Sequence, residues 1–308
     1  MRILLLMGPT ASGKSALALA LAERMGGEVV NADSMQVYRD FRVLTARPSP
    51  AEEARVPHHL YGHVDAGELH SVGRWLDDAL AAMNDIRARG RLPILVGGTG
   101  LYFKALTEGL AEMPSIDPET RAHLRARMAE AGAPALHGEL ARVDGEAAAR
   151  IKPNDSPRIL RALEVWETTG ASIATLQANT NPALAREQWA GLALTPDRAL
   201  LYAAIDARFE AMCAAGALDE VRAFAARGLD SALPAMKAHG APALMAHLRG
   251  EFSLADATAI AKRDTRRYAK RQFTWIANQM GDWTRVGEPD LSARVAAALA
   301  LSKRQGRA

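Results

Sequence analysis

The strongest constraint in this sequence is the octapeptide from Gly8 to Ser15, which reads Gly-Pro-Thr-Ala-Ser-Gly-Lys-Ser. It matches the phosphate-binding pattern G-x-x-x-x-G-K-[ST] at every fixed position. The apolar run at residues 2–7 predicts a buried parallel strand before the loop. Alanines and leucines at helical spacing over residues 14–25 predict a helix after it. The chain must therefore form a strand, a glycine-rich turn and a helix N-terminus in direct succession.

The loop predicts that the protein binds the phosphate groups of a ligand. Its glycines let the backbone turn so that successive N–H groups point inward, while the helix N-terminus adds partial positive charge and Lys14 adds a full charge. The hydroxyl of Ser15 is placed to ligate a Mg²⁺ ion that bridges phosphate oxygens. The residues expected to bind a diphosphate are Gly8, Pro9, Thr10, Ala11, Ser12, Gly13, Lys14 and Ser15.

Buried strands and amphipathic helices alternate through the N-terminal third of the chain. Residues 29–30 predict a second strand, and the apolar run at 92–96 predicts a third. Between them, apolar residues at helical spacing over 72–86 predict a helix that Ser71 caps and Gly90 ends. This alternation indicates an α/β fold with a parallel sheet and right-handed crossovers.

The pattern changes at about residue 114, where strand signals stop and the sequence becomes helical, charged and punctuated by prolines. The apolar segment at 189–194 then predicts a return to the sheet, and residues 198–308 are expected to be helical throughout. These changes predict an all-helical insertion within one α/β core. The expected bounds are residues 1–113 and 192–308 for the core and 114–191 for the insertion.

Composition excludes several classes of protein. The single cysteine, Cys213, rules out an internal disulfide and a cysteine-rich metal site. No apolar stretch is long enough to span a bilayer, and the N-terminal apolar run leads into the glycine loop instead of a cleavage site. We therefore expect a cytoplasmic protein without membrane partners. The formal net charge of +3 predicts little, because the clustering of positive charge matters more than its sum.

A carboxylate follows the second expected strand, in the stretch Asn-Ala-Asp-Ser-Met-Gln that ends at Gln36. Small-molecule kinases place an aspartate here to activate the acceptor hydroxyl, and another transferase could use Asp33 in the same way. The alternatives are a solvated loop aspartate or a helix cap. No carboxylate follows the strand at 92–96, where nucleotide hydrolases with this loop keep one for Mg²⁺.

Two basic stretches could bind nucleic acid. The first, residues 262–271, carries six basic residues on an expected helix, with Tyr268, Phe273 and Trp275 interleaved. Cations fit phosphates and aromatic rings can stack on unpaired bases. A solvated basic face with its aromatic side chains packed inward is an equally good interpretation. The second stretch, residues 150–161, places Arg158 and Arg161 on one helix face, as a charged helix of an ordinary domain would also do.

Three histidines, His58, His59 and His63, lie close together in the sequence beside Pro57. A zinc site would need a fourth ligand and a helix or strand to hold the set, and the sequence shows neither. Metal binding by these three histidines is therefore not expected.

Taken together, these motifs resemble those of bacterial tRNA dimethylallyltransferases, also called tRNA isopentenyltransferases, of the IPP transferase family. The matching segments occur in order from residue 2 to residue 280, so the resemblance covers nearly the whole chain. The loop alone is common, whereas the combination is specific. The matches are residues 8–15, 33–38, 57–60, 95–106, 154–165, 269–272 and 274–275.

The resemblance implies an enzyme with a P-loop NTPase-like core and an inserted helical domain that helps to clasp the anticodon arm of tRNA. It would transfer the dimethylallyl group of dimethylallyl diphosphate to the N6 amine of the adenosine on the 3′ side of the anticodon. The implied tRNAs read codons that begin with U, Mg²⁺ is required, and a monomer is expected.

The resemblance also implies roles for single residues. Asp33 would be the general base, while Thr10 and Arg208 would assist the diphosphate; Arg208 carries no signal by itself. The residues implied in tRNA contact are Asp33, Ser34, Met35, Gln36, Thr99, Arg121, Pro157, Arg158, Ile159, Leu160 and Arg161.

The sequence departs from the family pattern at two places. Many members have Gly-Tyr followed by a basic residue where this chain has Gly240-Ala241-Pro242, so no tRNA contact is assigned there. Pro157 stands where relatives often have glutamine, which leaves only a backbone contact at that position.

Three other functions are compatible with the sequence. A small-molecule kinase would use the same loop and Asp33. A prenyltransferase acting on free adenosine phosphates would need no helical clasp. A non-enzymatic RNA-binding protein would leave Lys14 and Ser15 unexplained.

Overall fold

The computed structural model describes residues 2–178, 180–288 and 290–304, which form two compact units. Leu106–Ala183 form one unit, and the chain on both sides of this segment forms the other, here called the core unit. The smaller unit starts and ends eight residues before the expected insertion at 114–191.

A six-stranded parallel sheet organises the core unit, with the strand order β3-β2-β4-β1-β5-β6. The parallel α/β architecture expected from the sequence is confirmed. The expectation that residues 198–308 are helical throughout is wrong, because a short edge strand forms near the end of the chain. The strands are β1 (Ile3–Met7), β2 (Gly27–Asn31), β3 (His58–His59), β4 (Leu92–Gly97), β5 (Trp189–Leu194) and β6 (Thr284–Val286).

Strand β1 lies near the middle of the sheet, between β4 and β5. All five of its residues are buried, which explains why its sequence is a continuous apolar run instead of an alternating one. The glycine loop that follows therefore emerges at the carboxyl edge of the sheet. Open α/β sheets bind their ligands at this edge.

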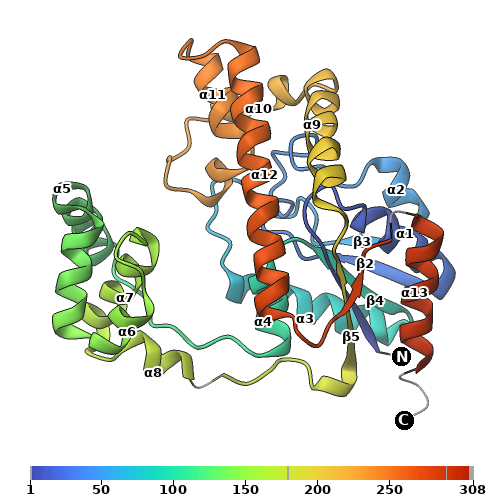
Figure 1. The fold of residues 1–308 in the computed structure, drawn as a ribbon, viewed down its shortest axis with the longest axis horizontal. Coiled ribbons are helices and arrows are strands. Elements are labelled where there is room, and N and C mark those ends of the chain that lie inside the picture. Colours follow the sequence, from blue (N-terminus) through green and yellow to red (C-terminus); the bar gives the residue numbers. More distant parts are fainter. Residues whose placement is uncertain (1, 179, 289, 305–308) are drawn as a thin grey trace. The chain divides into compact units, whose positions relative to one another are not determined.

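Helices cover both faces of the sheet, because side chains alternate in direction along each strand. Leu4 and Leu6 of β1 pack in one apolar cluster with α1 (Lys14–Met25) and α13 (Leu291–Arg304). Figure 1 shows α1 and α13 side by side, and they are in contact. On the opposite face, α3 (Val72–Ala88) packs against β2 and β4. The expected cap is confirmed, since the Ser71 side chain accepts the N–H of Arg74.

The remaining helices of the core unit carry or support the loops at the sheet edge. The long helix α12 contacts both α9 and α11, as Figure 1 shows. These helices are α2 (Pro50–Arg55), α9 (Arg198–Ala214), α10 (Ala217–Ala225), α11 (Ala241–Leu248) and α12 (Leu254–Gln279), with short 3₁₀ turns at Arg186–Gln188 and Pro234–Lys237. Helix α4 (Gly100–Thr107) leads from the core unit into the smaller one.

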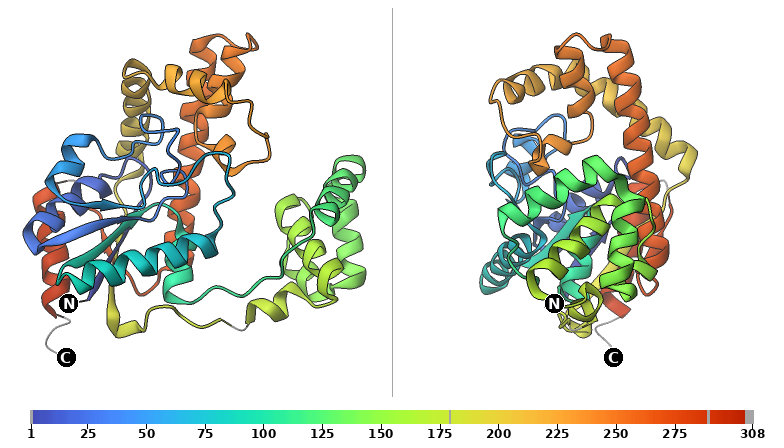
Figure 2. Two further views of the ribbon diagram at one scale, coloured as in Figure 1. Left: turned by 180° about the vertical axis from the view of Figure 1, so that it is seen from behind. Right: turned by 90° about the vertical axis from the view of Figure 1, so that its left-hand side faces the viewer.

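The smaller unit contains helices and no strand among its described residues (Figure 2). Its own apolar cluster is built from leucine, isoleucine, valine and alanine side chains of α5, α6, α7 and α8. Helix α5 changes direction at Gly132, whose φ of 79° is left-handed, just before Pro134. The helices are α5 (Pro118–Val143), α6 (Gly145–Arg150), α7 (Ser156–Thr169) and α8 (Ile173–Ala178).

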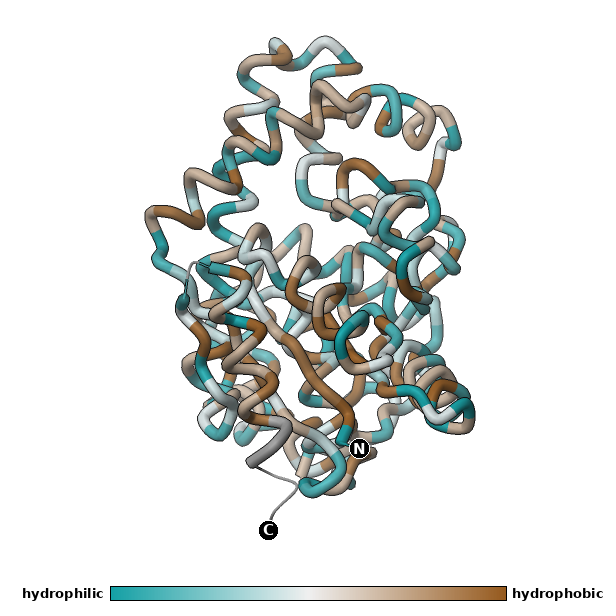
Figure 3. Tube along the Cα trace, turned by 90° about the vertical axis from the view of Figure 1, so that its right-hand side faces the viewer, coloured by the Kyte–Doolittle hydropathy of each residue, from teal (hydrophilic) through white to brown (hydrophobic). Residues whose placement is uncertain are grey.

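Hydrophobic residues follow the strands of the sheet, whereas hydrophilic and hydrophobic residues alternate along the helices (Figure 3). Among the described residues, no helix combines the length and the apolar character that a membrane crossing requires.

Candidate active site

The backbone of the phosphate loop makes the turn that its sequence predicts. Ala11 and Gly13 both have left-handed φ angles, of 63° and 81°. Gly13 is the residue before α1, so the backbone turns there directly into the helix N-terminus. The N–H of Ser12 donates to the carbonyl of Pro9 at 3.1 Å, which closes the turn. Inward N–H groups and a helix N-terminus together form an anion site.

Two buried side chains from distant helices hold this loop in place. The amide oxygen of Gln272 on α12 accepts the N–H of Thr10, and its amide nitrogen donates to the carbonyl of Gly98, both at 2.9 Å. Arg294 on α13 donates to the carbonyl of Ser12 at 2.6 Å. Sequence analysis assigned no role to either residue. The family resemblance included Gln272, and nothing in the sequence signalled Arg294.

Positive charge gathers around the loop. Arg208 on α9 donates a hydrogen bond to the hydroxyl of Thr10, which brings together two residues that sequence analysis assigned to one site. The pKa of Lys14 is lowered to about 8, mainly by burial; the carboxylate of Asp33 opposes this shift, and the charge of Arg208 adds to it. A desolvated lysine beside an arginine is prepared for an anionic ligand, which would restore the stability of its charged form.

Asp33 is held rigidly by its neighbours. Its N–H donates to the buried side chain of Asn31 at 2.8 Å, and its Oδ1 accepts the N–H of Met35 at 3.0 Å. Asn31 in turn donates to the carbonyls of Asp33 and Leu60, both at 3.0 Å. These bonds fix the carboxylate and engage Oδ1. The other oxygen, Oδ2, lies on the side of Gly98, since a Cβ built on that glycine would be 3.5 Å from it.

Two glycines after β4 let the segment that carries Asp33 approach the sheet edge. A Cβ on Gly97 would lie 1.9 Å from the carbonyl oxygen of Ala32, and a Cβ on Gly98 would lie 2.1 Å from Nε2 of Gln272. Any side chain at either position would push these groups apart. Thr99 follows directly, and its hydroxyl accepts the N–H of Ser34 at 2.9 Å, so Thr99 positions the segment from Asp33 to Gln36.

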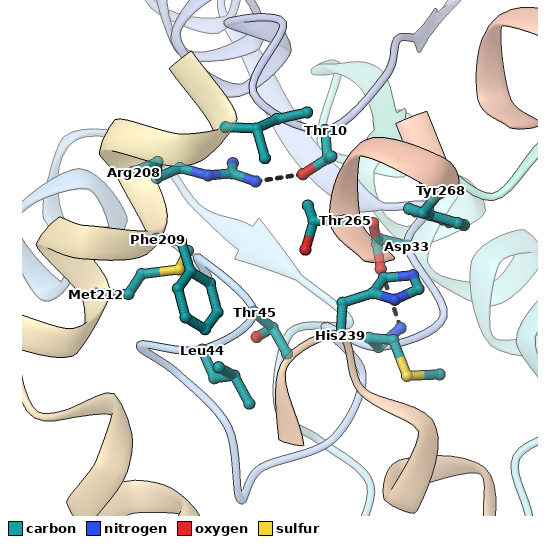
Figure 4. A pocket seen from close by; sticks show the side chains of 12 residues that line it. Thr10, Asp33, Leu44, Thr45, Arg208, Phe209, Met212, His239, Thr265 and Tyr268 are labelled. Carbon is teal, nitrogen blue, oxygen red and sulfur yellow. Dashed lines mark hydrogen bonds between the residues drawn. The ribbon is translucent and has the colours of Figure 1, made fainter. Parts of the chain in front are cut away.

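A cavity joins the loop to Asp33, and its two sides differ in character. Figure 4 shows Thr10, Arg208 and Asp33 around it, with the apolar side chains of Leu44, Phe209 and Met212 gathered on another side. Ile205 also lines the cavity, as do Met35, Thr45, His239, Thr265 and Tyr268. The site can therefore accommodate an anionic group and a short hydrocarbon group side by side.

The apolar side of the cavity depends on two contacts that sequence analysis did not find. Glu220 on α10 accepts the N–H groups of Arg42, Val43 and Leu44, at 2.5, 3.0 and 2.8 Å, and so anchors the loop that carries Leu44. Gly240 has a left-handed φ of 96°, and a Cβ there would lie 2.8 Å from the ring of Phe209. The left-handed backbone and the close contact with Phe209 therefore explain why position 240 is a glycine.

The remaining residues assigned to tRNA lie in the smaller unit. Arg158 is 73% exposed and pairs with Asp155 at 2.6 Å. Arg121 and Arg161 both contact Glu164, each at 3.4 Å. Ile159 is completely buried, so its side chain supports the helical core and only its backbone could reach a ligand. Pro157 is exposed and Leu160 is partly buried.

On the basic face of α12, two of the three aromatic side chains pack inward, whereas Tyr268 lines the cavity. Phe273 packs against the buried cluster of Leu201, Ile205 and Ala269. Trp275 lies against Gly100, where a Cβ would be 2.2 Å from the indole nitrogen. For Phe273 and Trp275, the structure therefore favours the solvated basic face over stacking on bases.

The first two histidines of the sequence cluster have structural partners. Nδ1 of His58 contacts the carbonyl of Val56 at 2.8 Å, and Nε2 of His59 contacts Glu28 at 2.7 Å. Within the described parts of the chain, the ring nitrogens of these two are not grouped with those of His63.

The lowered pKa of Lys14 predicts how diphosphate binding depends on pH. Below pH 8 the lysine is charged in the free protein, and above pH 8 it must gain a proton when the anion binds. Calorimetric titration with inorganic diphosphate in buffers of different ionisation enthalpy should show an uptake by Lys14 of about half a proton near pH 8. Affinity should fall as pH rises through 8.

Lys14→Arg is the matched control, because arginine stays charged at these pH values. In this variant, any proton uptake on binding is due to the diphosphate itself. Equal proton uptake by the wild type and Lys14→Arg would contradict the assignment of this proton to Lys14.

Comparisons with known proteins find relatives over most of the chain. The model of the IPP transferase family matches residues 36–279, and the isopentenyl transferase model matches residues 1–61. The tRNA dimethylallyltransferase of Rhodopseudomonas palustris strain BisB18 is 58% identical over 293 residues, which cover 95% of this chain and 92% of the relative. That of Nitrobacter hamburgensis is 59% identical over 289 residues, which cover 93% and 91%.

Solved structures give the same result. The crystal structure of the full-length tRNA isopentenylpyrophosphate transferase from Bacillus halodurans is 34% identical, with a TM-score of 0.72 over 99% of this chain and 96% of that one. A eukaryotic dimethylallyltransferase acting on tRNA is 27% identical, with a TM-score of 0.83 over 99% of this chain and 80% of that one. With a family model that matches most of its length and relatives above half identity, the chain belongs to the IPP transferase family.

Proposed function

We propose that this protein is a tRNA dimethylallyltransferase. It transfers the dimethylallyl group from dimethylallyl diphosphate to the N6 amine of the adenosine 3′ of the anticodon, in tRNAs that read codons beginning with U. The observation that supports this most strongly is the cavity that brings the phosphate loop, the Asp33 carboxylate and an apolar wall together. The relatives named as tRNA dimethylallyltransferases favour the same activity.

The reaction forms one C–N bond and breaks one C–O bond. The adenine amine attacks the first carbon of the dimethylallyl group, and diphosphate leaves with the electrons of the broken bond. This amine is a weak nucleophile, because its lone pair is delocalised into the ring. Asp33 accepts the amine proton as the new bond forms, which fits a rigid carboxylate with one oxygen engaged by Met35 and the other free to act.

Departure of the diphosphate requires that its developing negative charge be met in place. The N–H groups of the loop, the ammonium of Lys14 and the guanidinium of Arg208 surround that position, and Thr10 is held by Arg208. Donors fixed before the reaction stabilise such charge without reorganising. Opposite them, Leu44, Ile205, Phe209 and Met212 offer an apolar surface for the five-carbon group. That surface also excludes water, which would otherwise compete with the amine.

The loop is suited to Mg²⁺ when the diphosphate is bound. The exposed hydroxyl of Ser15 lies in the first turn of α1, next to Lys14. Mg²⁺ in phosphate sites takes few protein ligands and keeps several waters, so one hydroxyl together with diphosphate oxygens is a sufficient set. When bound, the ion would neutralise part of the diphosphate charge, and we propose Ser15 as its protein ligand.

We further propose that tRNA contacts both units of the chain. In the core unit, Thr99 positions Ser34, Met35 and Gln36 beside Asp33, where an extruded base would have to enter. In the smaller unit, Arg158 is the most exposed of the assigned arginines. We also propose that Arg121 and Arg161 contribute phosphate contacts there. Because one chain lines the whole cavity, a monomer suffices. We propose a cytoplasmic enzyme, since its proposed substrate is tRNA.

A small-molecule kinase is the competing function. Such an enzyme would use the same loop and Asp33, but with a nucleoside triphosphate as donor. Incubation with labelled dimethylallyl diphosphate and bulk tRNA, followed by nucleoside analysis, separates the two. We expect label in N6-dimethylallyladenosine without added nucleotide. Absence of label, with a metabolite phosphorylated by ATP instead, would refute the transferase.

Replacement of Asp33 tests the proposed base. We expect Asp33→Ala to lower turnover about 10²–10⁴-fold, the usual range for a general base, with far less change in tRNA affinity. Asp33→Asn keeps an oxygen for the N–H of Met35 and removes only the basic carboxylate, so it should lose comparable activity. Turnover is measured at saturating substrates, and unimpaired turnover in Asp33→Asn would show that this carboxylate is not the base.

Replacement of two arginines tests the proposed phosphate contacts of the smaller unit. Arg158→Ala with Arg161→Ala should weaken tRNA binding and reduce the slope of log Kd against log salt by about 1.5, since each lost phosphate contact contributes roughly 0.7–0.9. Arg142→Ala, an exposed arginine of the same unit, is the matched control. A salt slope equal to that of the control would remove both residues from the interface.

A further inference from the structure

A second group of chemically reactive side chains lies where the segment after β3 meets helix α3. His63 and His70 belong to that segment, and Asp78 projects from the second turn of α3. Each of the three offers one donor atom, and these atoms lie within 4.8 Å of one another. None of the three lines the active-site cavity. The reaction derived above leaves this group unexplained.

The spacing of the donor atoms is close to that of a metal site. Nε2 of His63 lies 3.3 Å from Oδ2 of Asp78, and Nε2 of His70 lies 3.8 Å from the same oxygen. Ligands of a tetrahedral Zn²⁺ ion are roughly 3.3 Å apart, given bonds of about 2.0–2.1 Å. The two imidazole rings stand at 89° to each other with centroids 5.4 Å apart, so neither ring covers the other. Small rotations of the side chains would close the set around one ion.

His70 is the member of the group that most needs a ligand. Its side chain is only 5% exposed, and its Nε2 has no hydrogen-bond partner among the described residues. A buried polar atom without a partner costs free energy of about 1–3 kcal/mol, so such atoms normally have a water or an ion. His70 lines a hollow of about 320 Å³ together with the other two members of the group.

The charge around the hollow suits a dication. Glu68, Asp77 and Asp78 line it together with a single cationic side chain, Arg74. Three carboxylates and one guanidinium give a formal charge of −2. The guanidinium of Arg74 is also engaged elsewhere, since it donates to the carbonyl of Leu69 at 2.9 Å. Two imidazoles with one carboxylate favour zinc and its first-row neighbours, whereas Mg²⁺ and Ca²⁺ prefer oxygen ligands throughout.

We propose that His63, His70 and Asp78 bind one first-row transition-metal dication, with Zn²⁺ as the expected ion and water or a neighbouring carboxylate completing its coordination. The ion fastens the segment after β3 to helix α3. That segment supports the active site, because its backbone pairs with the stretch that follows Asp33. Gly62 donates to Gln36 at 2.9 Å and Val64 donates to Val37 at 3.0 Å. The site is distinct from the Mg²⁺ position proposed at Ser15.

The test uses Co²⁺ as a spectroscopic probe in the full-length protein, freed of metal by chelation and dialysis. Nitrogen-ligated Co²⁺ in a four-coordinate site absorbs strongly in the visible range. We expect one equivalent of Co²⁺ to produce this absorption, equimolar Zn²⁺ to abolish it, and Mg²⁺ to have no effect. Zn²⁺ should also raise the melting temperature, because an ion that binds only the folded state stabilises it.

Asp78→Asn and His63→Gln change partly exposed side chains, so both variants should fold. We expect each to weaken Co²⁺ binding at least ~10-fold and to lose the stabilisation by Zn²⁺. Asp85→Asn, an exposed aspartate on the same helix, is the matched control and should bind as the wild type does. Absence of absorption in the wild type at several-fold excess Co²⁺, or equal binding by Asp78→Asn and wild type, would overturn the proposal.

Discussion

The arrangement of the active site depends on one buried amide. The side chain of Gln272 accepts from the phosphate loop and donates to the carbonyl of Gly98, just after β4, and it is 3% exposed. Leaving either half of a buried amide unpaired would cost about 1–3 kcal/mol, so helix α12 can dock in only one register against both groups. Because Gly97 also lies against Ala32, the position of β4 fixes the segment that carries Asp33. The distance between the diphosphate position and the base therefore follows from backbone packing.

The backbone packing around Gln272 lets the protein hold like charges close together despite their repulsion. The charge of Arg208 lowers the pKa of Lys14, and the carboxylate of Asp33 only partly compensates for burial and for this repulsion. Burial is the main cause of the lowered pKa of both cations. The like charges lower the stability of the folded protein when no anion is bound, and diphosphate binding restores that stability. The rigid attachment of the loop by Gln272 and Arg294 is what keeps the cations in place meanwhile.

The sequence predicted those features that depend on neighbours along the chain. The phosphate loop, helix α3 with its Ser71 cap and the strand β5 all have local patterns of apolar spacing or capping. Strands β3 and β6 have two and three residues, which is too short for any periodic signal. Gln272 and Arg294 act on residues 262 and 282 positions away, so only the fold could reveal their roles. The role of His70 was not predicted for the same reason, because its closeness to Asp78 depends on how α3 packs.

Counting basic residues overstates the charge that is available to a nucleic acid. On α12, Lys262, Arg263, Arg266 and Arg267 each pair with an aspartate or glutamate. Exposed ion pairs contribute only about 0–1 kcal/mol, so an exposed arginine can exchange its carboxylate for a phosphate at little cost. Arg158, whose side chain is largely in solvent, meets this condition. Glu164 is 10% exposed and would lose more, because a buried carboxylate needs its partners. Arg121 and Arg161 can therefore serve tRNA best if they share their charge between Glu164 and a phosphate, which makes Glu164 a determinant of their orientation.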